Sequence, residues 1–120
     1  MLKNDLYTIS SFNHEENKIL AEIKIDHTHR IFDGHFPGQP VLPGVCTVEI
    51  LKELVSEAKE KIYKLKEAHN IKFLSLVDPS QTNKLLFKID YIEEDGMLKI
   101  NAAANLDNET TTFKVKGVLI

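Results

Sequence analysis

Residues 34–49 read Gly34-His35-Phe36-Pro37-Gly38-Gln39-Pro40-Val41-Leu42-Pro43-Gly44-Val45-Cys46-Thr47-Val48-Glu49, and this stretch holds three of the four prolines and three of the five glycines of the chain. Proline fixes φ and removes an amide donor, whereas glycine permits tight turns and close approach to the backbone. The stretch therefore predicts a rigid loop that runs directly into a helix, with a histidine at its entrance and a glutamate inside the helix.

The helix is expected to run from about Pro43 to about Ala68, since proline suits the first helical position. Apolar residues at helical spacing predict one buried stripe, formed by Val48, Leu51, Val55, Ala58, Ile62 and Leu65. Glu57/Lys61 and Glu60/Lys64 are spaced four apart and would support the opposite face of the helix.

Alternating apolar residues predict strands on both sides of this helix, at residues 5–13, 17–25, 70–77, 84–92, 97–105 and 110–119. A long helix needs its apolar stripe covered, and a curved antiparallel sheet of about six strands can wrap it. The 120 residues are therefore expected to form one α+β domain.

Composition narrows the class of protein. The net charge is -3 and Arg30 is the only arginine, so a nucleic-acid function is not indicated. We expect no membrane span, because no run approaches the roughly 18 apolar residues that a span needs. The lone Cys46 and the absence of an apolar leader at Met1 favour the cytoplasm.

Three groups of the opening stretch fit the removal of water from a β-hydroxy thioester. An imidazole, with an ordinary pKa of about 6.5, is largely neutral at cytoplasmic pH, so His35 can take the proton next to the carbonyl. Glu49, if an apolar tunnel keeps it partly protonated, can help the hydroxyl leave. The amide of Gly44 at the helix start has no intrahelical acceptor and can stabilise negative charge on the carbonyl oxygen.

The pattern Gly34-His35-Phe36-Pro37-Gly38-x-Pro40-x-x-Pro43-Gly44-Val45-x-x-x-Glu49 resembles the active-site signature of the β-hydroxyacyl-acyl carrier protein dehydratases, which have the hot-dog fold. The glutamate at position 49 is similar to the branch that only dehydrates. After this glutamate the family usually continues Ala-Met-Ala-Gln, whereas this chain continues Ile50-Leu51-Lys52-Glu53.

The resemblance implies a catalytic base at His35, a partner at Glu49 that handles the hydroxyl, and a carbonyl-binding amide at Gly44. Phe36, Pro43 and Val45 are the further substrate-binding candidates. It also implies a homodimer with two sites, in which His35 of one chain meets Glu49 of the other. The substrate would be a (3R)-hydroxyacyl group on acyl carrier protein, the product a trans-2-enoyl thioester, and no metal or other cofactor is expected.

Other side chains have simpler interpretations. His27 and His29, with His35 downstream, could suggest a metal site, but no further Cys/His cluster completes it. Cys46 is more consistent with packing than with a nucleophile. His14 and His69 are expected at the surface. The lysines at 59, 61, 64 and 66 could dock an acidic carrier protein, although alternating charge usually marks a solvated helix face.

Two rival functions remain open at this stage. A non-catalytic hot-dog subunit, which binds acyl chains or pairs with an active homologue, is suggested by the polar helix and by the lack of the family's usual amino-terminal segment. A hot-dog thioesterase, with Glu49 activating water, would leave His35 without a role and would release a free thiol. Fold alone does not separate these functions.

Overall fold

A computed structural model of the protein describes residues 1–33, 40–106 and 110–120. In chain order its elements are β1 (Tyr7–Glu15), β2 (Lys18–Ile25), the 3-10 helix η1 (Arg30–Phe32), α1 (Gly44–Lys59), β3 (Leu65–Phe73), β4 (Lys84–Glu94), β5 (Met97–Asn105) and β6 (Thr111–Leu119). The predicted α+β class is confirmed.

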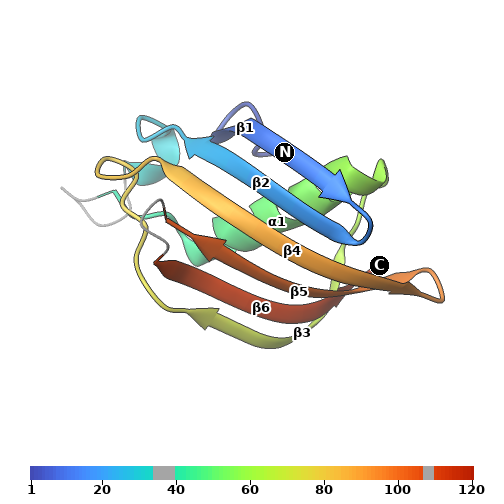
Figure 1. The fold of residues 1–120 in the computed structure, drawn as a ribbon. Coiled ribbons are helices and arrows are strands. Elements are labelled where there is room, and N and C mark those ends of the chain that lie inside the picture. The colour runs from blue at the N-terminus through green and yellow to red at the C-terminus, as the bar shows by residue number, and fades with distance from the viewer. Residues whose placement is uncertain (34–39, 107–109) are drawn as a thin grey trace.

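The six strands form one antiparallel sheet in the order β1-β2-β4-β5-β6-β3. The sheet curves, and α1 lies along its concave face (Figure 1). Alternate residues of β2, β4, β5 and β6 are buried, as expected for strands with one face on a core and one in water. The edge strand β3 brings the segment that follows α1 next to the last strand of the chain.

Helix α1 contributes its buried face to the core of the sheet. Its inward residues are Cys46, Thr47, Ile50, Leu51, Glu53, Leu54 and Val55. Ile50, Leu54 and Val55 are fully buried, whereas Val48 and Ala58 of the predicted stripe are only partly buried. The predicted stripe was thus right in period but placed slightly off the face that meets the sheet.

The predicted carboxyl end of the helix, near Ala68, was wrong. The helix ends at Lys59 because Glu60 takes the left-handed conformation (φ 53°, ψ 41°) and donates its N–H to the carbonyl of Ser56. The Ser56 hydroxyl then accepts the N–H of Tyr63, whose side chain is buried. Burial of this tyrosine turns the chain back toward the sheet.

Residues beyond the helix end therefore have different roles from those predicted. Ile62 is 84% exposed outside the helix, and Leu65 begins β3. The four-apart pairs cannot form on a helix that stops before Lys61. Glu57 pairs with Lys3 instead.

Strand β3 begins at Leu65 rather than at residue 70, and two register shifts mark its pairing with β6. Only glycine fits at position 117 of β6, next to these register shifts, because a Cβ there would lie 2.4 Å from the carbonyl oxygen of Glu67. Eight of the nine β3 residues are exposed, so the strand has no alternating pattern. In the residues that the structure describes, no helix combines the length and apolar character that crossing a membrane requires.

Candidate functional site at the amino end of α1

At the amino end of α1, the Gly44 amide is placed as the sequence predicts, without an intrahelical acceptor. Pro43 is the N-cap with extended backbone (φ -63°, ψ 142°) and makes no side-chain capping bond. The N–H groups of Cys46 and Thr47 donate to the carbonyl of Pro43. Within the described residues, the amide of Gly44 donates to no backbone carbonyl, so it remains available to an oxyanion.

Phe73, at the end of β3, lies against Gly44. A Cβ added at Gly44 would be 2.7 Å from Cζ of Phe73, so a side chain there would force the ring to move. The Phe73 ring also packs on Phe113 of β6, with ring centroids 5.3 Å apart. Glycine at position 44 therefore permits both close packing of the aromatic ring and approach to the helix amides.

A groove of about 420 Å³ opens at this place. Its mostly apolar walls are formed by Val41, Leu42, Pro43, Gly44, Val45, Thr47, Phe73, Ser75, Leu76, Val77, Thr112 and Phe113. The volume is within the usual range for small-ligand sites. Three predicted substrate-binding residues, Pro43, Gly44 and Val45, thus share one groove.

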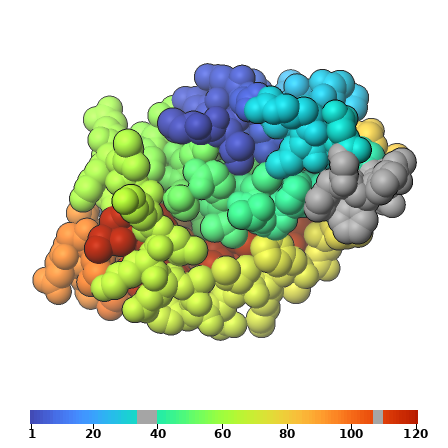
Figure 2. Space-filling model, turned by 180° about the vertical axis from the view of Figure 1, so that it is seen from behind, coloured from blue at the N-terminus to red at the C-terminus, as the bar shows by residue number. Residues whose placement is uncertain are grey.

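Glu49 lies on the same helix but does not line this groove. Its side chain is 40% exposed, and Oε1 is 2.9 Å from Nζ of Lys52. Figure 2, which views the molecule from the helix side, shows α1 at the surface between the amino-terminal segment and β3. Within one chain Glu49 therefore faces outward from the open side of α1.

His35 and Phe36 lie outside the described residues, so their roles remain predictions. Cys46 is buried in the first turn of α1, as the packing interpretation predicts. Burial, and secondarily the charge of Glu49, raises the pKa of the Cys46 thiol. Both effects disfavour a nucleophilic thiolate.

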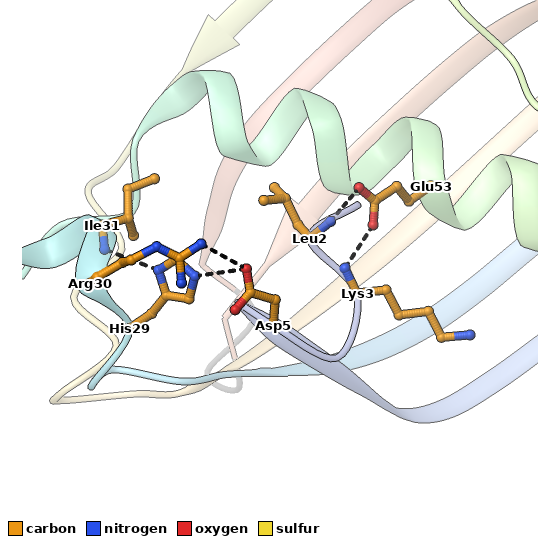
Figure 3. A network of polar contacts seen from close by, with 7 residues as sticks. All are labelled: Leu2, Lys3, Asp5, His29, Arg30, Ile31 and Glu53. Carbon is orange, nitrogen blue, oxygen red and sulfur yellow. Dashed lines mark hydrogen bonds and ion pairs between the residues drawn. The ribbon is translucent and has the colours of Figure 1, made fainter.

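Both ring nitrogens of His29 make contacts with nearby residues. Its Nδ1 accepts the N–H of Ile31 at 3.0 Å, and its Nε2 is 3.2 Å from Oδ2 of Asp5, which also pairs with Arg30 (Figure 3). The His29 imidazole, assisted by Arg30, lowers the pKa of Asp5. The described ranges contain no group of three His, Cys, Asp or Glu side chains that could hold a metal ion.

The two histidines predicted at the surface differ from each other. His69 is exposed and pairs with Glu67, which fits the surface prediction. His14 is partly buried, and its Nε2 is 2.8 Å from the hydroxyl of Tyr91. This histidine therefore packs at the end of β4 more closely than the sequence indicated.

Glu53 is a polar residue whose role the sequence did not indicate. It is 6% exposed, and its carboxylate accepts the backbone N–H groups of Leu2 and Lys3 at 2.8 and 2.9 Å (Figure 3). The hydroxyl of Tyr7 donates to the same carboxylate. The only sequence signal was that Glu53 stands where the similar family usually has glutamine.

A helix held in a curved six-stranded antiparallel sheet, with an apolar groove at its amino end, defines a protein of the hot-dog fold. A family model described as "ApeI-like: ApeI dehydratase" matches residues 11–114. The chain therefore belongs to the hydroxyacyl-acyl carrier protein dehydratase family, in its ApeI-like branch. The resemblance seen in the sequence is thereby confirmed.

Individual relatives agree with this assignment. The chain is 35% identical over 104 residues to the 3-hydroxyacyl-[acyl-carrier-protein] dehydratase FabZ of Lactococcus lactis, covering 81% of this chain and 68% of that protein. It is 31% identical over 99 residues to FabZ of Oenococcus oeni, covering 77% and 70%.

Solved structures support the same fold. The dehydratase heterocomplex ApeI:P from Xenorhabdus doucetiae superposes with a TM-score of 0.76 at 25% identity, covering 92% of this chain and 95% of that chain. A thioesterase from Haemophilus influenzae superposes with a TM-score of 0.64 at 18% identity, covering 97% and 78%. The second likeness shows the fold alone.

Proposed function

We propose that the protein dehydrates a (3R)-hydroxyacyl thioester on acyl carrier protein to the trans-2-enoyl thioester. The observation that carries the proposal is the apolar groove whose wall includes Gly44, the first residue of α1. A thioester carbonyl placed against this amide gains a hydrogen bond as negative charge develops on its oxygen. FabZ relatives at about 30% identity support the same reaction class.

The reaction is an elimination. His35 removes the proton from the carbon next to the carbonyl, and the electron pair of this C–H bond becomes the new double bond. The bond from the β-carbon to its hydroxyl breaks, and the hydroxyl leaves as water after receiving a proton. Glu49 donates that proton, directly or through water, and the Gly44 amide stabilises the enolate-like oxygen.

We further propose a homodimer in which each site combines His35 of one chain with Glu49 of the other. Glu49 does not line the groove of its own chain, and its side chain is 40% exposed, which supports a shared site. Large apolar side chains near the groove are exposed as well: Val45 by 76%, Phe73 by 55% and Leu76 by 67%. Such a patch is typical of a surface that another chain covers.

The test uses the wild type, His35→Ala and Glu49→Gln with a 3-hydroxybutyryl thioester, with enoyl product and free thiol measured together. The expected result is enoyl product without thiol release, and a loss of activity by orders of magnitude in both folded variants. Free thiol instead of enoyl product would support the thioesterase alternative. An inert wild type would favour a binding subunit or one that needs an active homologue.

Mixing the two inactive variants tests whether the site is shared. Subunit exchange creates mixed dimers in which one site has both His35 and Glu49, so activity should return. If each site used both residues of a single chain, no mixture would recover activity.

A cytoplasmic location, which the free thiol of Cys46 favours, is part of the proposal.

A further inference from the structure

A second hollow, of about 330 Å³, lies on the face of the sheet away from α1. Its polar lining comes from β3, β5 and β6 and consists of Asn70, Lys72, Asn101, Lys114 and Lys116. Ala102 and Val115 are buried toward the core, so their neighbours along each strand face outward. We call these five side chains the lysine hollow.

The strand register concentrates positive charge in the lysine hollow. Lys72 is directly opposite Lys114, and Lys116 is opposite both Asn70 and Asn101. Like charges directly opposite each other on neighbouring strands are destabilising. Among the residues that the structure describes, no Asp or Glu lines the hollow or pairs with its lysines.

Other surface lysines have acidic neighbours. A hollow beside β2 and β4 combines Lys18 and Lys88 with Glu15, Glu16 and Asp90. The hollow at Lys24 contains Asp5 and Asp26. The lysine hollow is therefore a local cationic surface on a chain whose net charge is -3, which is the arrangement that attracts an acidic partner.

The lysine hollow adjoins the candidate site. Phe73 and Phe113, which line the groove, are paired across β3 and β6. Lys72 directly precedes Phe73, and Lys114 directly follows Phe113. The groove and the hollow are thus on opposite faces of the same end of the β3–β6 pair. A partner bound at the hollow is close to the end of β3, where the chain enters the groove wall.

We propose that the lysine hollow docks the acidic surface of the acyl carrier protein that delivers the thioester, an inference that rests on the proposed function. Lysine ammonium groups act as point charges that steer carboxylates, whereas bidentate recognition of phosphate favours arginine. The lysine cluster predicted on the helix is less suitable. Lys59 is paired with Glu93, and Lys66 contacts Sδ of Met97.

The test reverses the charge of the opposed pair in a Lys72→Glu/Lys114→Glu variant. Turnover is compared on 3-hydroxybutyryl-acyl carrier protein and on 3-hydroxybutyryl-coenzyme A. We expect kcat/KM for the carrier substrate to fall about tenfold or more, because two attractive contacts become repulsive, and to remain unchanged for the coenzyme A thioester. The wild-type kcat/KM on the carrier substrate should also fall as ionic strength rises.

The matched control is Lys24→Glu/Lys84→Glu, which reverses another directly opposed lysine pair on β2 and β4. An equal loss in this control would assign the effect to net charge and overturn the inference. If the Lys72→Glu/Lys114→Glu variant loses kcat/KM equally on the coenzyme A thioester, the hollow recognises phosphate groups rather than a carrier protein, and the inference is overturned. An unchanged kcat/KM on the carrier substrate also overturns it.

If the wild type turns over neither substrate, the proposed function fails, and docking is then measured directly. Calorimetric titration of acyl carrier protein onto the wild type and the Lys72→Glu/Lys114→Glu variant decides it. Binding that the variant loses supports the docking surface. Equal binding by both proteins, or no binding to the wild type, overturns it.

Discussion

The Tyr7 hydroxyl donates a 2.9 Å hydrogen bond to Oε1 of Glu53, which joins the first strand to the middle of α1. The amides of Leu2 and Lys3 donate to the same carboxylate, so one buried anion holds the amino-terminal segment on the helix. A buried carboxylate is tolerated when hydrogen bonds satisfy its oxygens. This contact fixes one border of the open face of α1 on which Glu49 lies.

Replacing Glu53 by glutamine should lower the free energy of unfolding by about 2 kcal/mol, because the amide nitrogen would face a backbone donor and one donor would lose its acceptor. The matched control is Glu57→Gln, which removes a charge that pairs with Lys3 at the surface. It should change stability by less than about 0.5 kcal/mol. Urea denaturation of both variants measures the difference, and equal effects would contradict a special role for Glu53.

The buried hydroxyl of Tyr7 should make the free energy of unfolding fall at alkaline pH. Burial, followed by the Glu53 hydrogen bond, raises the pKa of Tyr7 above its ordinary value of 10.0. The unfolded chain therefore releases this proton at lower pH than the folded chain. The stabilising contribution is complete below pH 10 and falls by about 1.4 kcal/mol per pH unit above it.

Tyr7→Phe isolates this effect, since the other tyrosines and the lysines titrate in both proteins. At pH 8 the variant should be less stable by about 1 kcal/mol through loss of one hydrogen bond. At pH 11 the gap should shrink by about 1.4 kcal/mol, and so close or reverse, because only the wild type loses stability as the unfolded chain releases the Tyr7 proton. Denaturation curves at pH 8, 9, 10 and 11 test this, and a constant gap would show that Tyr7 does not titrate between the two states.

Cys46 should react slowly with thiol reagents in the native protein. Its side chain is buried, and burial and the charge of Glu49 raise the pKa of its thiol, so the reactive thiolate is scarce. A disulfide reagent at pH 8 should modify the urea-unfolded chain completely before it modifies the native chain appreciably. Rapid native modification would instead indicate an accessible, activated thiol.

The start of α1 could be predicted from sequence, and its end could not. Pro43 and Gly44 are strong local signals for a helix start. Beyond Lys59 the residues keep helical spacing and favourable charges, so local preference continues where the helix does not. Burial of Tyr63 and the pairing of β3 with β6 decide the end, and both depend on residues distant in the chain.

The candidate site divides in a similar way. Gly44 could be placed at a helix start from its neighbours, but the Phe73 ring over it is set by the β3–β6 register. The role of Glu53 depends on backbone amides about 50 residues away, which no side-chain pattern encodes. His35 and Phe36 stay predictions from the signature.

Gly44 and Phe73 together allow the carbonyl-binding role to be separated from packing. A methyl group at position 44 would contact Phe73, but this ring is 55% exposed and can move, so Gly44→Ala should cost less than about 1 kcal/mol of stability. Its dehydration activity should nevertheless fall by about two orders of magnitude, since the methyl group would obstruct the amide that we propose binds the thioester oxygen.

The second substitution, Phe73→Leu, removes the aromatic contact that the methyl group meets. If Gly44 serves the reaction by exposing its amide, the Gly44→Ala/Phe73→Leu double variant should regain stability and remain nearly inactive. If Gly44 serves only to make room for the ring, the double variant should regain both. Thermal unfolding and the rate of enoyl formation, measured for the two single variants and the double variant, decide between these roles, because coupling between neighbouring residues appears as non-additivity in either quantity.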